Sequence, residues 1–133
     1  MGIPEDFEPL STSPFSERIG PLYVNRRDSV PVIGVRIEPH HANRLGRAHG
    51  GLLMTLADVA LSRAVREHLP PGATLATADL HIAFLEAIGQ DDWLEAVPSV
   101  DRIGRALVHG SCVLRSGERD VARAMGTFAV RLG

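Results

Sequence analysis

The amino-acid sequence predicts an α+β fold in which one antiparallel sheet of five or six strands curls round a single long helix. A stretch of about eighteen residues, starting after Gly51, contains good helix formers and neither Pro nor Gly. The segments after residue 73 alternate apolar and polar side chains and are separated by short turns, as strands are. Small residues recur on one face of the last two strands, which favours close packing against the helix.

Length and composition set the class of protein. A chain of 133 residues with 44% hydrophobic residues is long enough for one domain with its own core. The formal net charge of −2 provides no basic footprint for nucleic acid, and no apolar window reaches the roughly 18 residues that span a bilayer. Cys112 is the only cysteine, and the acidic N-terminus does not resemble a signal peptide. We therefore expect a cytoplasmic protein that binds neither nucleic acid nor membranes.

The N-terminal part divides into an arm and the start of the domain. Residues 1–14 combine three prolines with acidic and hydroxyl side chains, so we expect a flexible arm there and a single domain over residues 15–133. Apolar residues from 15 to 24 predict a short helical turn that leads into a first strand. Residues 30–38 predict a second strand, with Pro31 at its start.

The long helix lies within Asn43–His68. Its apolar residues are spread round most of the circumference, which predicts that other structure encloses it. It ends before Pro70 and Pro71, which cannot continue a helix. Four strands follow, over residues 74–85, 93–100, 106–115 and 121–132, and their short connections predict an antiparallel meander. Strict alternation in the first of these places Thr77, Asp79 and His81 on the face opposite Leu80 and Ile82.

Asp58 lies in the middle of this largely apolar helix. It shares a face with Gly51, Met54, Thr55 and Ser62, and such a polar stripe favours a functional site. The structural alternative is that the hydroxyls bond back to the helix backbone and that a nearby arginine pairs with Asp58.

His49-Gly50-Gly51 stands where the helix begins. The first amides of a helix have no intrahelical partner, so two glycines would leave them open to a carbonyl oxygen or an anion. The alternative is a sharp turn that merely requires glycine. Asp58 lies eight residues after Gly50, about 12 Å along the helix axis, so one protomer cannot easily present both groups to one carbonyl. A symmetric dimer that pairs Gly50 of one chain with Asp58 of the other would solve this.

Two other polar groups need an interpretation. His40, His41 and His49 show no recognised zinc spacing, so we expect no metal site. Arg102 and Arg105 flank a tight turn that suits phosphate contacts, although exposed arginines in a hairpin are usually just solvated.

Five short motifs occur in a distinctive order and spacing. They are Asn43-x-x-Gly46-x-x-His49-Gly50-Gly51, Leu56-Ala57-Asp58, Thr77-x-Asp79-Leu80, Gly104-Arg105 and Gly126-Thr127-Phe128. Together they resemble the hotdog-fold acyl-CoA thioesterases of the phenylacetic-acid-degradation type, over nearly the whole chain after residue 15. The resemblance implies that the helix is enclosed by the sheet, that two protomers join their sheets into a homodimer with interface active sites, and that dimers often pair into a homotetramer.

The resemblance also implies roles for individual residues. Gly50 offers its amide to the thioester carbonyl, and Asp58 of the partner acts as general base or nucleophile. Asn43 and His49 lie near the sulfur, and Thr77 helps to orient the water. We expect Gly51, Arg102 and Arg105 at the mouth that holds CoA.

The sequence thus predicts an acyl-CoA thioesterase that releases a free acid and CoA and needs no cofactor beyond its substrate. Two alternatives stay open: a non-catalytic acyl-CoA-binding sensor, and a hotdog enoyl-CoA hydratase or dehydratase. The sequence does not specify the acyl chain.

Overall fold

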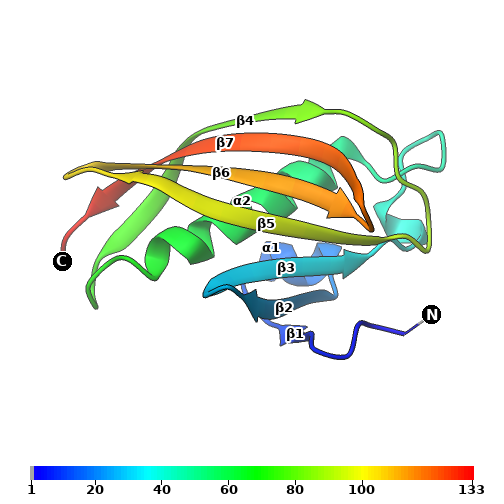
Figure 1. Cartoon of the computed structure of the whole chain (residues 1–133), viewed down its shortest axis with the longest axis horizontal. Coiled ribbons are helices and arrows are strands. Elements are labelled where there is room, and N and C mark those ends of the chain that lie inside the picture. Colours follow the sequence, from blue (N-terminus) through cyan, green and yellow to red (C-terminus); the bar gives the residue numbers. More distant parts are fainter. Residues whose placement is uncertain (1) are drawn as a thin grey trace.

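In the computed structural model, which describes residues 2–133, a curved antiparallel sheet wraps round one long helix (Figure 1). The helix, α2, spans Gly50–Arg66, and the sheet has seven strands in the order β1-β2-β3-β5-β6-β7-β4. The remaining elements are β1 (Glu8–Leu10), α1 (Pro14–Ile19), β2 (Leu22–Arg27), β3 (Val30–Arg36), η1 (Pro39–His41), β4 (Thr74–Phe84), β5 (Trp93–Ile103), β6 (Leu107–Ser116) and β7 (Arg119–Arg131). The α+β prediction is confirmed, but the sheet has seven strands and not the expected five or six.

The additional strand lies within the segment for which the sequence predicts a flexible arm. Met1 is outside the described residues, but Glu8–Leu10 pairs with β2 as strand β1. Phe7 is buried and its ring meets Trp93 edge-on, with 5.1 Å between the ring centroids. Residues 7–10 are therefore not a free arm, because one aromatic side chain supplies apolar burial that the proline-rich composition hides.

The enclosure of α2 is confirmed. Leu56, Ala57, Ala60 and Leu61 have 0% of their surface exposed, and they form one core with the inner faces of β3, β5, β6 and β7. The helix ends at Arg66, before Pro70, as its sequence predicts.

The predicted four-stranded meander is wrong in one respect. β5, β6 and β7 follow one another as expected, but β4 pairs with β7 and not with β5. After α2 crosses the concave face of the sheet, the chain enters at the far edge and residues 85–92 carry it back across to β5 (Figure 1). β4 is therefore an edge strand of the sheet.

Glycines in β6 and β7 let the helix approach the sheet. A Cβ at Gly110 would lie 2.8 Å from Leu61 Cδ2 and 3.0 Å from the Ser99 carbonyl oxygen, and one at Gly126 would lie 3.2 Å from Leu61 Cδ1. The sheet at these positions has no room for a side chain, so the small residues seen in the sequence are a packing requirement.

We predict that Gly110→Ala lowers the free energy of unfolding by about 1–3 kcal/mol, because the added methyl group overpacks the contact with Leu61. Urea unfolding at one fixed protein concentration measures this. Gly89→Ala is the matched control, since a Cβ there would meet no atom within 4 Å and φ is not positive. Equal stability of the two variants would contradict the close approach.

Candidate functional site

A β-bulge in β4 determines which way Thr77 faces. Thr77 pairs with Phe128 while Asp79 pairs with Thr127, so Ala78 is an extra residue without a partner on β7. The bulge reverses the alternation on one side of it, and Thr77 therefore lies on the inner face with Leu80 and not opposite to it. The expectation from strict alternation is wrong for Thr77 for this reason.

The inward Thr77 reaches the carboxylate of α2. Its hydroxyl donates a hydrogen bond of 2.6 Å to Oδ1 of Asp58. Asp58 is half-buried, and within residues 2–133 no arginine forms an ion pair with it. Thr55 does bond back to the backbone, at 2.8 Å from the Gly51 oxygen, as the structural alternative predicts. The arginine half of that alternative is wrong, and Asp58 keeps one oxygen free of protein donors in the described chain.

The start of α2 presents one open amide. The His49 side chain caps the helix, because its Nδ1 accepts from the Gly51 N–H at 2.8 Å. The backbone oxygen of His49 accepts from Leu52 and Leu53. Among residues 2–133, the Gly50 N–H has no protein acceptor within hydrogen-bonding distance. Gly50 thus has the geometry of a carbonyl-binding donor, whereas the Gly51 amide is already occupied.

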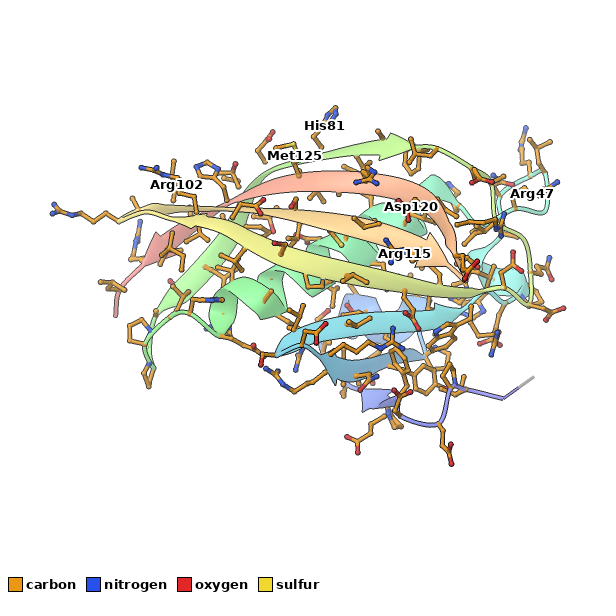
Figure 2. The ribbon with its side chains drawn as sticks, viewed as in Figure 1. Arg47, His81, Arg102, Arg115, Asp120 and Met125 are labelled. Carbon is orange, nitrogen blue, oxygen red and sulfur yellow. The ribbon has the colours of Figure 1, made fainter. Side chains whose placement is uncertain are left out.

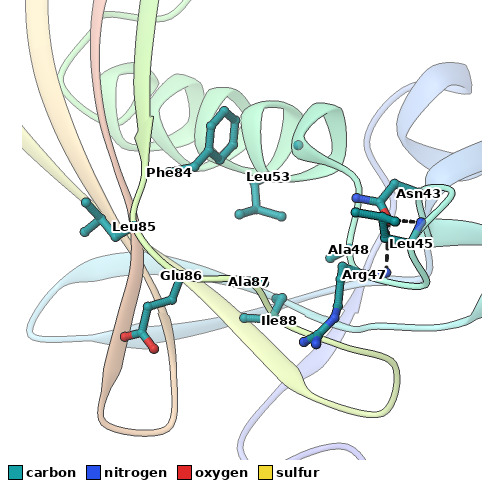
Figure 3. A pocket seen from close by; sticks show the side chains of 11 residues that line it. Asn43, Leu45, Arg47, Ala48, Leu53, Phe84, Leu85, Glu86, Ala87 and Ile88 are labelled. Carbon is teal, nitrogen blue, oxygen red and sulfur yellow. Dashed lines mark hydrogen bonds between the residues drawn. The ribbon is translucent and has the colours of Figure 1, made fainter.

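Asn43 holds the loop that leads into the helix. Its Oδ1 accepts from the amides of Leu45, at 2.9 Å, and Arg47, at 3.1 Å. The backbone N–H of Asn43 donates to the backbone carbonyl oxygen of Arg47 at 2.7 Å. Figure 3 shows this loop beside Ala48 at the cavity. The side-chain oxygen of Asn43 is therefore used for loop geometry, and only its NH₂ group remains for a ligand.

A cavity of about 380 Å³ lies directly beside Gly50 (Figure 3). Most of its wall is apolar, and the Phe84 ring lies 3.1 Å from where a Cβ of Gly50 would be. Asn43, Arg47 and Glu86 supply polar groups at its border. The apolar lining comes from Leu45, Ala48, Leu53, Phe84, Leu85, Ala87 and Ile88. The sequence did not single out Phe84 or Leu53 for this site, because an apolar residue in a strand or helix is equally typical of the core.

A second cavity, also about 380 Å³, is lined by His49 and by residues of α1. Phe15, Ile19 and Leu52 form its apolar wall. His40 and His41 bond to the carbonyl oxygens of Gly20 and Ile19, at 2.7 and 2.5 Å. These two side chains brace the end of α1 against η1.

The two halves of the site and the basic turn stay apart within one chain. Gly50 and Asp58 lie on one continuous helix, eight residues apart, which is about 12 Å along its axis. Arg102 and Arg105 are exposed at the β5–β6 hairpin, and Figure 2 shows Arg102 at the end of the molecule opposite Arg47 in the loop before α2. A single chain therefore does not gather all the predicted residues. Within residues 2–133, no helix is long and apolar enough to cross a membrane.

Residues 45–123 match the model of the thioesterase superfamily, which has the hotdog fold. Together with the enclosed helix, this match shows that the chain belongs to the thioesterase superfamily and is a thioester hydrolase. The resemblance noted in the sequence is confirmed at the level of fold and family.

Three similar proteins extend this finding. "Putative esterase PA0474" from Pseudomonas aeruginosa is 40% identical over 131 residues, which cover 96% of this chain and 97% of that protein. The solved BH2602 protein from Bacillus halodurans with CoA is 29% identical with a TM-score of 0.71, over 75% of this chain and 66% of that one. A solved mutant of the phenylacetic acid degradation protein PaaI from Thermus thermophilus shares the fold, with 24% identity and a TM-score of 0.78 over 88% of this chain and 98% of that one.

His41 gives the fold a predictable pH dependence. Burial lowers the pKa of His41, against the smaller opposing effect of its hydrogen bond to Ile19. The unfolded chain then binds the proton more tightly than the folded protein, so stability should fall as the pH drops below about 6.5. We predict that His41→Gln destabilises the protein at pH 8 and that the difference from the wild type narrows by pH 5.

Urea unfolding at pH 8, 6.5 and 5, at one protein concentration, measures this difference. The control is His68→Gln, since the His68 side chain is exposed just after α2. A constant gap between wild type and His41→Gln across this range would contradict the assignment.

Proposed function

We propose that the protein hydrolyses acyl-CoA thioesters to a free acid and CoA, at sites that two subunits share. The observation that carries the proposal is that one helix presents two separate polar groups. At its start the Gly50 N–H is open, and farther along the Asp58 carboxylate accepts a hydrogen bond from Thr77. These are the two groups that hydrolysis of a thioester requires, an oxyanion donor and a base or nucleophile.

The proposed reaction starts with the thioester carbonyl bound to the Gly50 N–H. Asp58 of the partner subunit takes a proton from a water molecule, whose oxygen attacks the carbonyl carbon. The resulting oxyanion accepts a hydrogen bond from the Gly50 N–H until it collapses to the carboxylic acid and the carbon–sulfur bond breaks. The departing CoA thiolate takes the proton that Asp58 had accepted from water and leaves as the thiol, which returns Asp58 to its carboxylate form. His49 and the NH₂ group of Asn43 stand near this leaving sulfur. In the alternative route Asp58 attacks directly, and water then hydrolyses the mixed anhydride.

The substrate class rests on the cavity beside Gly50 and on one relative. The apolar wall with Phe84 and Leu53 suits an acyl group, and the B. halodurans protein was solved with CoA. We place the nucleotide part of CoA at the mouth near Gly51, with Arg102 and Arg105 of the partner subunit as phosphate contacts. The reaction needs no further cofactor, because CoA arrives with the substrate.

The edge position of β4 supports a homodimer. An unpaired edge strand is a template for pairing with another chain, and pairing two β4 strands would give one continuous sheet with two sites. A dimer of dimers would cover further apolar surface, such as Met125 on the outer face, which is 64% exposed. Light scattering in solution distinguishes the two assemblies.

Two alternatives predict different products. A non-catalytic sensor would bind acyl-CoA without releasing a thiol, and a hydratase or dehydratase would change an enoyl-CoA without cleaving it. A panel of phenylacetyl-, benzoyl-, short-chain and long-chain acyl-CoAs with a thiol-detecting dye, together with product analysis for an enoyl-CoA, separates the three functions. Absence of thiol release across the whole panel would contradict the proposed hydrolysis.

We predict that Asp58→Asn lowers kcat for thioester hydrolysis by about 10²–10⁴, because the amide cannot take the proton from water or attack the carbonyl. The measurement is the rate of thiol release under saturating substrate. Light scattering and a thermal melt check that the assembly and fold persist. Full activity in this variant would rule out Asp58 as base or nucleophile.

Thr77 should act by positioning Asp58. Thr77→Val removes the donor to Oδ1 at nearly constant volume, and we expect kcat to fall about 10–100-fold, the value of a hydrogen bond to a charged group. Thr77→Ser keeps the hydroxyl and should retain most of the activity. If valine and serine have the same effect on kcat at unchanged KM, the hydroxyl has no part in orienting the carboxylate.

A further inference from the structure

The cavity lined by α1 and His49, called the α1 cavity below, is separate from the cavity beside Gly50. Each has a volume of about 380 Å³, and no residue lines both of them. The proposed reaction uses the cavity beside Gly50 for the acyl group, and it gives the α1 cavity no role. The α1 cavity is therefore available to a second ligand.

Two histidines of the α1 cavity keep free hydrogen-bonding atoms. The Nδ1 of His49 accepts from the Gly51 N–H at 2.8 Å, so the neutral ring carries its proton on Nε2. The Nε2 of His40 lies 2.7 Å from the Gly20 carbonyl oxygen, which can only accept, so the neutral ring is unprotonated at Nδ1. Within residues 2–133, neither the His49 Nε2–H nor the His40 Nδ1 has a hydrogen-bond partner. The cavity thus offers one free donor and one free acceptor.

The third histidine of the lining has no capacity left for a ligand. The Nδ1 of His41 accepts from the Glu38 N–H at 2.9 Å, and its Nε2 donates to the Ile19 oxygen. The Thr55 hydroxyl donates to the Gly51 oxygen, so its own oxygen can only accept. His41 therefore braces the cavity wall, and recognition of a ligand falls to His40 and His49.

Backbone hydrogen bonds hold these two histidines in one braced unit. The His49 N–H donates to the His41 oxygen at 2.8 Å, and Ala42 pairs with Ala48 in an isolated β-bridge. The rings of His40 and His41 lie 3.9 Å apart between centroids. Because η1 is tied to the start of α2 in this way, the free donor and the free acceptor are presented to the same cavity by a rigid frame.

The lining of the α1 cavity restricts the chemistry of its ligand. No arginine, aspartate or glutamate lines it, so a phosphate ester would find no fixed positive charge and a cation no carboxylate. Its remaining wall is apolar, formed by Phe15, Ile19 and Leu52. A volume at the low end of the range of about 300–1,000 Å³ for small-molecule pockets suits a short chain or a single ring.

A carboxylic acid with an apolar group meets all of these conditions. Its carbonyl oxygen can accept from the His49 Nε2–H, and its proton can lie between the other carboxyl oxygen and the His40 Nδ1. The apolar group then packs against Phe15 and Ile19. Hydrolysis of any thioester releases such an acid, so a thioester hydrolase produces this ligand itself.

We propose that the α1 cavity binds the apolar carboxylic acid that the enzyme releases, and that the bound acid slows further hydrolysis. The effect on the rate rests on the proposed function, in which His49 stands near the leaving sulfur. An acid that occupies the His49 Nε2–H takes this donor from the sulfur without entering the cavity beside Gly50.

Binding is tested without a thioester, by calorimetric titration of the protein with phenylacetate. Phe15→Ala removes part of the apolar wall and should weaken binding about tenfold. His40→Phe keeps a ring but removes the acceptor, and it should weaken binding by at least as much. The matched control is Glu17→Ala, which should bind as the wild type does, because Glu17 is exposed on the same helix and does not line the cavity. Wild-type affinity in both Phe15→Ala and His40→Phe, or no binding to the wild type, would overturn the site.

The effect on the rate is tested by thiol release under saturating acyl-CoA. Substrate then displaces acid from the cavity beside Gly50 but not from the α1 cavity, so phenylacetate should lower kcat of the wild type. Phe15→Ala should have the same kcat without acid and need about ten times more phenylacetate for the same inhibition. Inhibition that disappears at saturating substrate would overturn the regulatory role. Calorimetric binding in a protein that releases no thiol from any acyl-CoA would instead contradict the proposed function and leave the acid site standing.

Discussion

A helix enclosed by a sheet must bring its backbone close to the strands, and the rest of this structure depends on that approach. Leu61 occupies the space that side chains at Gly110 and Gly126 would fill. This contact seats α2 deeply enough for its apolar circumference to be buried by β3, β5, β6 and β7 together. Asp58 lies on the side of α2 that faces the edge strand β4, where it is half-buried and accepts a hydrogen bond from Thr77.

The same enclosure keeps the open amide of Gly50 and the carboxylate of Asp58 apart. The only open amides of a buried helix are at its start, and Asp58 is fixed about 12 Å farther along a rigid rod. No side-chain rotation brings these two groups together, so the proposed function needs a second subunit to complete each site. The distance between amide and carboxylate in a complete site would therefore be set by an interface and not by local loops.

Much of this could be predicted from the sequence, and the failures have clear causes. The bounds of α2, the small residues of β6 and β7, and the half-buried Asp58 follow from composition and helical spacing. The pairing of β4 with β7 did not, since short turns favour neighbouring strands and no local signal reports that a helix has carried the chain to the far edge. Strand β1 was hidden among prolines, because it depends on Phe7 meeting Trp93, 86 positions later in the chain. The cavity wall formed by Phe84 has no sequence signal of its own.

The bulge at Ala78 is the clearest feature that the sequence pattern does not predict. The residues before and after Ala78 alternate regularly between the two faces. A sequence pattern therefore assumes the same alternation at Ala78 and places Thr77 on the wrong face. One extra residue changes the face of a hydroxyl, and with it the hydrogen bond that orients Asp58. Bulges occur where a strand must re-aim a side chain, and here the re-aimed residue contacts the only carboxylate on the enclosed helix. An irregularity that looks like a defect in the strand is thus what connects the edge of the sheet to the carboxylate on the helix.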